Sequence, residues 1–128
     1  MAEQLSLFSP QHYKQPIGAA RVAEIQARMK DCQGCTLCGA RRTVVVGAGR
    51  TEKPLLALVA GAPDQMEDWS GAPVGGAPGQ LLDQILNWMG LAREDQFVCH
   101  VVGCKPAEFR EPSATELEAC RPYLQGQL

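Results

Sequence analysis

The run Leu-Leu-Ala-Leu-Val at residues 55–59, followed by Ala-Gly-Ala-Pro at residues 60–63, decides the fold that we expect for this chain. A short, continuously apolar run is typical of a strand in a parallel sheet that is buried on both faces. A second such run covers residues 97–103. The helix predicted between the two runs carries its apolar residues on one face: Leu81, Leu82, Ile85, Leu86 and Met89. This order predicts an α/β domain, a parallel sheet flanked by helices with right-handed crossovers.

The rest of the chain divides into an arm and further elements of one domain. Residues 1–18 are polar with Pro10, Pro16 and Gly18, so we expect a flexible N-terminal arm followed by a domain over residues 19–128. Apolar periodicity predicts a helix over 19–30, and β-branched residues predict a strand over 43–46. The stretch 60–79 has the composition of a loop. Ser113 and Glu116 form a capping box that opens a last helix, which Pro122 should bend or shorten.

Composition limits the classes of function that are open. The chain has 128 residues, enough for a single core, and a net charge of −2. No apolar run approaches the ~20 residues that span a bilayer, and no secretory signal is visible, so we expect a cytoplasmic protein without a membrane partner. The acidic balance argues against tight autonomous binding to DNA. Five cations near the cysteines form either one basic patch or a set of scattered solvated charges: Arg41, Arg42, Lys105, Arg110 and Arg121.

The spacing of the cysteines predicts a metal site. Cys32 and Cys35 form a C-x2-C pair, and Cys104 and Cys120 lie far downstream. Thiolates of this number bind either zinc or an iron–sulfur cluster. A second close pair, which most zinc sites have, is missing, so the pattern favours a cluster. Cys38 continues a ferredoxin-like spacing and is a rival ligand, whereas Cys99 lies in a predicted strand and is expected to be a small buried hydrophobe. Six unrelated free thiols are the least favoured alternative.

A set of motifs between Cys32 and Leu124 resembles the family 4 uracil-DNA glycosylases, which carry a [4Fe-4S] cluster. The motifs are Cys-x2-Cys-x-Leu-x3-Arg from residue 32, Ala-Pro at 62–63 with Glu-Asp at 67–68, Gly-x-Pro at 71–73, Gly-Gln-Leu-Leu at 79–82, Val-Val-Gly-Cys-Lys-Pro at 101–106 and Glu-Ala-Cys-Arg-Pro-Tyr-Leu at 118–124. The resemblance implies the family's fold, shortened at the C-terminus. It also implies a [4Fe-4S] cluster held by Cys32, Cys35, Cys104 and Cys120.

At the positions that the resemblance makes catalytic, this chain carries other residues. Gly61 replaces an acidic residue, Asp64 a glycine, Val74 the aromatic on which a flipped base stacks, and His100 the Asn that reads the uracil edge. Base–aromatic stacking is worth ~1–3 kcal/mol per base, and acid–base catalysis ~10²–10⁴-fold. We therefore expect no catalytic residues and a non-catalytic binding protein. The alternative is a working glycosylase in which Asp64 supplies the acid and His100 a hydrogen bond.

The first residues give a partner. A Q-L-S/D-L-F peptide binds the bacterial sliding clamp, and this motif is matched by Gln4, Leu5, Leu7 and Phe8. In the alternative interpretation, Leu5, Leu7 and Phe8 instead cap the core of this domain. An inert glycosylase scaffold, a clamp peptide and a short cytoplasmic chain together predict a replisome or repair accessory, and the scaffold resembles the psi subunit of bacterial DNA polymerase III, a small α/β protein without excision activity. The resemblance implies a replisome accessory with a structural cluster, whose partners are the clamp, clamp-loader subunits, a chi-like subunit and, weakly, DNA. The alternatives are a clamp-recruited uracil-DNA glycosylase of base-excision repair and a redox sensor.

Overall fold

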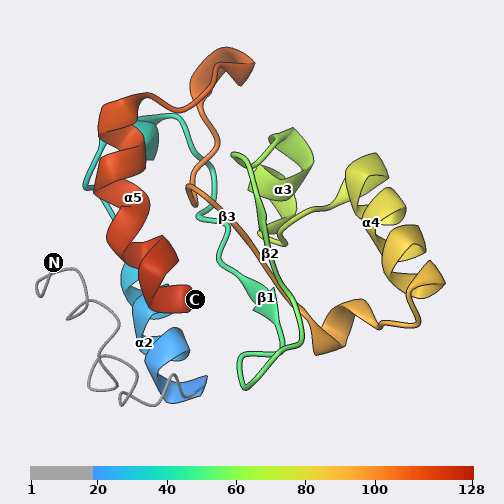
Figure 1. Cartoon of the computed structure of the whole chain (residues 1–128). Helices are drawn as coiled ribbons and strands as arrows, with labels where there is room; N and C mark the ends of the chain where they lie inside the picture. The colour runs from blue at the N-terminus through green and yellow to red at the C-terminus, as the bar shows by residue number, and fades with distance from the viewer. Residues whose placement is uncertain (1–18) are drawn as a thin grey trace, which may run out of the picture.

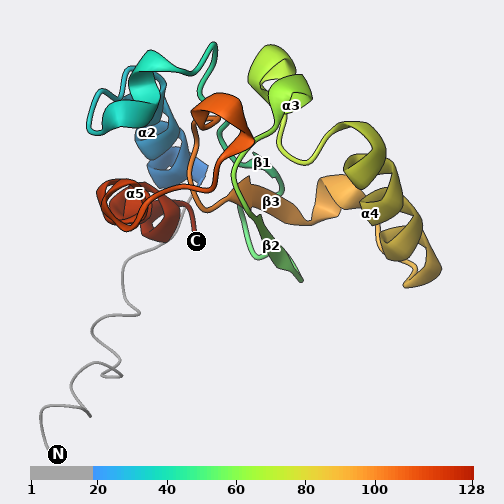
Figure 2. The same ribbon diagram turned by 90° about the horizontal axis from the view of Figure 1, so that it is seen from above.

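The computed structural model of the chain describes residues 19–128. The predicted arm, with its clamp-type peptide, lies outside the described residues. Two helices lie side by side on one flank of a small sheet, α2 (Ala19–Lys30) and α5 (Ala114–Gln127), while α3 (Gln65–Ser70) and α4 (Gly76–Trp88) lie on the other flank (Figures 1 and 2). Short 3-10 helices occur at Thr36–Gly39 (η1), Arg93–Asp95 (η2) and Ala107–Phe109 (η3). Within this described part, no helix is both long and apolar enough to cross a membrane.

The sheet confirms the α/β class and is mixed in direction. Its strands are β1 (Ala48–Gly49), β2 (Ala57–Ala60) and β3 (Phe97–His100), in the order β1-β3-β2. β2 runs parallel to β3 with Leu58 opposite Val98, as predicted, whereas β1 runs antiparallel to β3. A parallel crossover needs a dozen or more residues. The connection between β1 and β2 is shorter than that, so the chain reverses direction there.

Two predicted strands differ from those observed. Residues 43–46 do not form a strand, and only Val45 N–H pairs with Gly103 C=O, at 2.7 Å. β3 is buried along its whole length, as expected, but β2 is half open, with Ala57 and Val59 exposed, Val59 to 44%. The prediction of a β2 buried on both faces is therefore wrong, because the helices α3 and α4 leave one face of it in solvent.

The helices follow local signals of unequal strength. α2 has the predicted bounds, and α5 opens at the predicted capping box but continues past Pro122 to Gln127, so the proline does not shorten it. The helix α3 was expected to be loop. It is set by a capping box between Asp64 and Glu67, and it ends at Gly71 with a φ of 75°.

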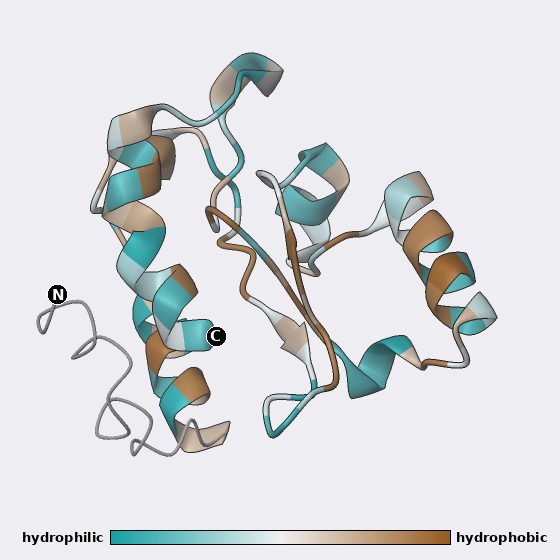
Figure 3. Cartoon of the chain, in the orientation of Figure 1, coloured by the Kyte–Doolittle hydropathy of each residue, from teal (hydrophilic) through white to brown (hydrophobic). Residues whose placement is uncertain are grey.

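The core lies on the α2/α5 side of the sheet and surrounds the cysteines. Its buried cluster consists of Met29, Leu37, Val44, Val102 and Cys104. On the opposite flank, the helix α4 carries a series of apolar residues (Figure 3). Several large apolar side chains on α4 and directly after it are exposed: Leu81, Ile85, Trp88 and Met89. The molecule is thus well packed around the sulfur atoms and open around α4.

Candidate functional site

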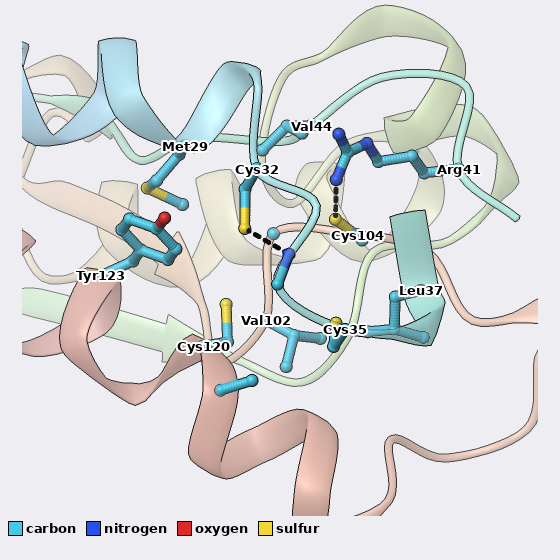
Figure 4. Close-up of a pocket in the computed structure, with 13 residues that line it drawn as sticks. Met29, Cys32, Cys35, Leu37, Arg41, Val44, Val102, Cys104, Cys120 and Tyr123 are labelled. Atoms are coloured by element: carbon cyan, nitrogen blue, oxygen red, sulfur yellow. Dashed lines mark hydrogen bonds between the residues drawn. The ribbon is translucent and has the colours of Figure 1, made fainter. Parts of the chain in front are cut away.

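The four cysteines predicted as ligands come together in one pocket. Cys32, Cys35, Cys104 and Cys120 all line one pocket that is partly open to solvent. Figure 4 shows their thiols around this space, with Met29, Val102 and Tyr123 beside them. Residues separated by most of the chain therefore meet at one place.

Each of the four cysteines is placed by a different element. Cys32 lies two residues beyond the end of α2, and its N–H donates to Met29 C=O at 3.0 Å, while Cys35 directly precedes η1. Cys104 ends the bend that follows β3, and Cys120 projects from the middle of α5. A group bound by all four would join the start of the domain to its last helix.

Hydrogen-bond donors point at the sulfur atoms. Arg41 Nη1 donates to Cys104 Sγ at 3.2 Å, and Gly34 N–H donates to Cys32 Sγ at 3.4 Å (Figure 4). Burial raises the pKa of Cys104, while the Arg41 guanidinium opposes that rise. Burial also raises the pKa of Cys120, opposed by a hydrogen bond from the Gly103 backbone. Such donors stabilise the thiolate relative to the thiol, and the thiolate is the form that binds a metal.

The arrangement fits a cluster better than a single ion. A tetrahedral zinc ion with Zn–S bonds of about 2.3 Å brings its sulfur ligands to within about 4 Å of one another. Within residues 19–128, no group of three or more His, Cys, Asp or Glu side chains converges in that way. In a cubane each thiolate binds a different iron, so the four sulfur atoms surround a space, as they do here.

The two remaining cysteines have other surroundings. Cys99 is buried in β3, and burial raises its pKa to about 11, so it stays a neutral thiol as expected of a small hydrophobe. Cys38 lies on η1 and is half-buried. Its N–H donates a hydrogen bond to Cys35 C=O at 3.3 Å, and the residue does not line the cysteine pocket.

Glu116 braces the cysteine pocket from outside and was recognised in the sequence only as a helix cap. Its carboxylate accepts a hydrogen bond from Thr36 Oγ1 at 2.9 Å and one from each Nη atom of Arg110, at 2.7 and 2.8 Å. Glu116 also forms the predicted capping box with Ser113. Thr36 follows Cys35 directly, and Cys120 lies one turn after Glu116. The brace therefore turns Cys120 toward the Cys35 loop.

A second hollow lies where two parallel strands end. It holds about 430 Å³. Its border after β2 is formed by Gly61, Ala62, Pro63 and Asp64, and the rest of its border by Val101, Lys105, Pro106, Arg110, Glu111, Pro112 and Leu117. In open α/β sheets, ligands bind outside the carboxyl ends of the strands. This hollow is therefore the candidate substrate site.

The four residues at expected catalytic positions lie around these strand ends. Asp64 borders the hollow, and its Oδ1 accepts Glu67 N–H at 2.9 Å. A side chain at Gly61 would meet no atom within 4 Å. His100 is buried, with Nδ1 2.7 Å from Gly61 C=O and Nε2 3.3 Å from Val74 N. The structure thus brings Gly61, Val74 and His100 together, because the His100 ring contacts backbone groups of the other two residues.

Comparison with known proteins identifies the relatives of this chain. Residues 46–128 match the uracil DNA glycosylase superfamily. Type-4 uracil-DNA glycosylases from Pyrobaculum aerophilum and Saccharolobus solfataricus are 40% identical over 100 residues and 36% identical over 105 residues. These alignments cover 78% and 81% of this chain, and 50% and 48% of the relatives. The enzyme from Thermotoga maritima is 36% identical over 104 residues, which are 81% of this chain and 54% of that protein.

These relatives correct the functional prediction. The expected non-catalytic, psi-like replisome accessory is wrong, because all these similar proteins carry the name of an enzyme, type-4 uracil-DNA glycosylase. The alternative, a glycosylase, agrees better with them. Nothing in the comparisons supports a clamp-loader or chi-like partner. The chain spans about half the length of the curated relatives it matches. By the match over residues 46–128, the chain belongs to the uracil DNA glycosylase superfamily.

Proposed function

We propose that this chain acts in DNA repair as a uracil-DNA glycosylase that carries a [4Fe-4S] cluster. The observation that carries the proposal is the 36–40% identity to type-4 enzymes over 100–105 residues, which are 78–81% of this chain. DNA is the macromolecular partner that this function requires.

Cys32, Cys35, Cys104 and Cys120 are the proposed ligands of the cluster. When bound, the cluster supplies a covalent fastening between the loop before η1, the end of β3 and the middle of α5. Arg41 and Gly34 N–H, which donate to two of the sulfur atoms, would offset part of its negative charge. Visible absorbance of iron purified with the protein under anaerobic conditions tests this assignment, since zinc is colourless.

The strand-end hollow is the proposed site of a flipped nucleotide. Its volume of about 430 Å³ and its position fit an extruded base, while Lys105 on its border has the charge that suits a DNA phosphate. Asp64 is the proposed acidic group. Val74 has no ring on which a base can stack and Gly61 has no carboxylate, so we propose slow excision by comparison with relatives that have both groups.

The direct test is release of uracil from a single-stranded oligonucleotide under single-turnover conditions. Wild type should cleave, and Asp64→Asn should lose activity about 10²-fold or more. Asn is as good a helix N-cap as Asp, so this variant keeps α3. Glu118→Gln, an exposed change on α5, is the matched control. No release by wild type at enzyme excess would refute the proposed excision of uracil.

A gain-of-function variant sharpens the test. Gly61→Glu places a carboxylate at the position to which the resemblance gives an acidic residue, and an added Cβ there meets no atom within 4 Å. We expect about 10²-fold faster release than in wild type, and no gain with Gly61→Gln, which has the same size without the charge. Equal rates for the two variants would show that the site does not use an acid at this position.

The sliding clamp is a proposed partner through Gln4, Leu5, Leu7 and Phe8, on the sequence motif alone. A triple alanine variant at Gln4, Leu7 and Phe8 should lose binding to a purified bacterial clamp in surface plasmon resonance. Unchanged affinity would remove the clamp from the proposal and leave excision unaffected.

A further inference from the structure

The loop between α3 and α4 holds a conformation that its sequence disfavours. Val74 has a φ of 49°, in the left-handed region. For a β-branched residue this is an outlier, and it costs on the order of 1–3 kcal/mol. Contacts from the surrounding structure must supply that energy.

Part of the support comes from side chains that bind the loop backbone. Arg93 Nη2 donates to Pro73 C=O at 2.6 Å and also to Val74 C=O. Glu67 Oε1 accepts Gly75 N–H at 3.0 Å. Gly79 lies so close beneath that an added Cβ would come within 2.4 Å of Val74 O.

His100 binds Val74 itself and also reaches the opposite loop. Its Nδ1 lies 2.7 Å from Gly61 C=O, and because a carbonyl only accepts, Nδ1 carries the proton. In the neutral ring, Nε2 then accepts Val74 N–H, at 3.3 Å. The side chain is only 3% exposed. The imidazole therefore bridges the loop after β2 and the loop before α4.

Glu67 forms a second brace between the same two loops. Its Oε2 accepts Asp64 N–H at 2.8 Å while Oε1 holds Gly75, and Oε2 lies 3.3 Å from His100 Nε2. Both side chains are almost fully buried. Two adjacent side chains thus fix the spacing between residues 61–64 and residues 73–75.

We propose that His100 is a positioning residue of the glycosylase site, which sets Val74 against the Gly61 wall of the strand-end hollow. The inference rests on the proposed function. The resemblance gives this position to an Asn that reads the edge of uracil, but here backbone groups engage both ring nitrogens. Catalytic geometry must be held to within about 0.5 Å, so a side chain that ties the Gly61 border of the hollow to the loop before α4 acts on the rate without touching the base.

Asn and Gln variants separate the two ends of the bridge. The Asn amide occupies the place of Nδ1, so His100→Asn keeps Gly61 and releases Val74. The Gln amide reaches the place of Nε2, so His100→Gln keeps Val74 and releases Gly61. In amide exchange of the full chain, Val74 should exchange up to about tenfold faster in His100→Asn and near the wild-type rate in His100→Gln. Nitrogen NMR of the wild-type ring should show a proton on Nδ1.

Kinetics distinguish a positioning residue from a base reader. If His100 positions the loops, His100→Asn and His100→Gln should both lower kcat for uracil release with little change in KM, because each variant releases one end of the bridge. A higher kcat in His100→Asn would overturn the proposal, as would equal Val74 exchange in the two variants or an unprotonated Nδ1. Absence of uracil release from wild type with the expected exchange pattern would refute excision and leave the bridge established.

Discussion

Replacing the buried Glu116 by Gln should loosen the cysteine pocket more than a change at an exposed position of α5. The carboxylate is 3% exposed and accepts from Arg110, Thr36 and Ser113. Gln keeps the shape and one acceptor, but it turns the other oxygen into a donor that faces Arg110. The substitution therefore removes the charge and at least one arm of the bidentate pair.

The expected loss of unfolding free energy follows from these contacts. Hydrogen bonds to a charged group contribute ~1.5–3 kcal/mol, and a lost helix cap costs ~0.5–2 kcal/mol. Arg110 is 45% exposed, so water solvates it again once its partner is gone, and that limits the loss. We expect Glu116→Gln to lose about 2–3 kcal/mol in urea unfolding.

Glu118→Gln is the matched control, because it lies on the same helix and pairs with Arg121 at 2.8 Å, with side chains 64% and 57% exposed. Such a surface pair contributes about 0–1 kcal/mol. The iron–sulfur absorbance should also decay faster in Glu116→Gln than in Glu118→Gln. Equal losses of stability in the two variants would refute the role of Glu116 as the brace of the pocket.

Acid should have the same effect as the substitution. The Arg110 guanidinium and the Ser113 cap hold the pKa of Glu116 far below its usual range. A carboxyl whose pKa is lowered in the folded state stabilises the fold above its unfolded pKa of about 4.3, and this contribution is lost as the pH falls below that value. The difference in stability between wild type and Glu116→Gln should therefore shrink below about pH 4.

Two further changes test individual contacts. Arg41→Gln removes the cation that donates to Cys104 Sγ, so iron should be released to a chelator several times faster than from wild type, as measured by visible absorbance. Gly79→Ala places a Cβ 2.4 Å from Val74 O and should lower stability by about 1–3 kcal/mol in thermal unfolding. Gly39→Ala meets no atom within 4 Å and should change stability by less than about 0.5 kcal/mol.

The sequence carried strong information where one local signal dominated. The helix α2 follows from apolar residues at helical spacing, and α5 from a capping box. The spacing and motifs grouped Cys32, Cys35, Cys104 and Cys120, and the structure places these four in one pocket, while their binding of a cluster stays a prediction. These features depend on few partners, so a single sequence was enough to predict them.

Where tertiary contacts decide, the sequence was a weaker guide. Residues 43–46 have strand-forming side chains, but β3 ends at His100 and leaves only Val45 with a bond to Gly103. In α3, Met66 and Trp69 are exposed, so no apolar period reveals the helix. The predicted function was wrong because the interpretation gave four altered positions more weight than the similarity of the whole sequence. The contacts of His100 with the Gly61 and Val74 backbone could be found only in the three-dimensional structure.

The cysteine pocket and the strand-end hollow share one short segment of chain. After His100, Val101 and Lys105 border the hollow, while Val102, Gly103 and Cys104 line the cysteine pocket. One side of the segment therefore faces the proposed substrate and the other the proposed cluster. Because Val102 and Cys104 belong to the buried core, a shift of Cys104 cannot be absorbed locally and must move Lys105 and the end of β3. The cluster would then act on base excision by fixing the wall of the hollow, without taking part in the chemistry.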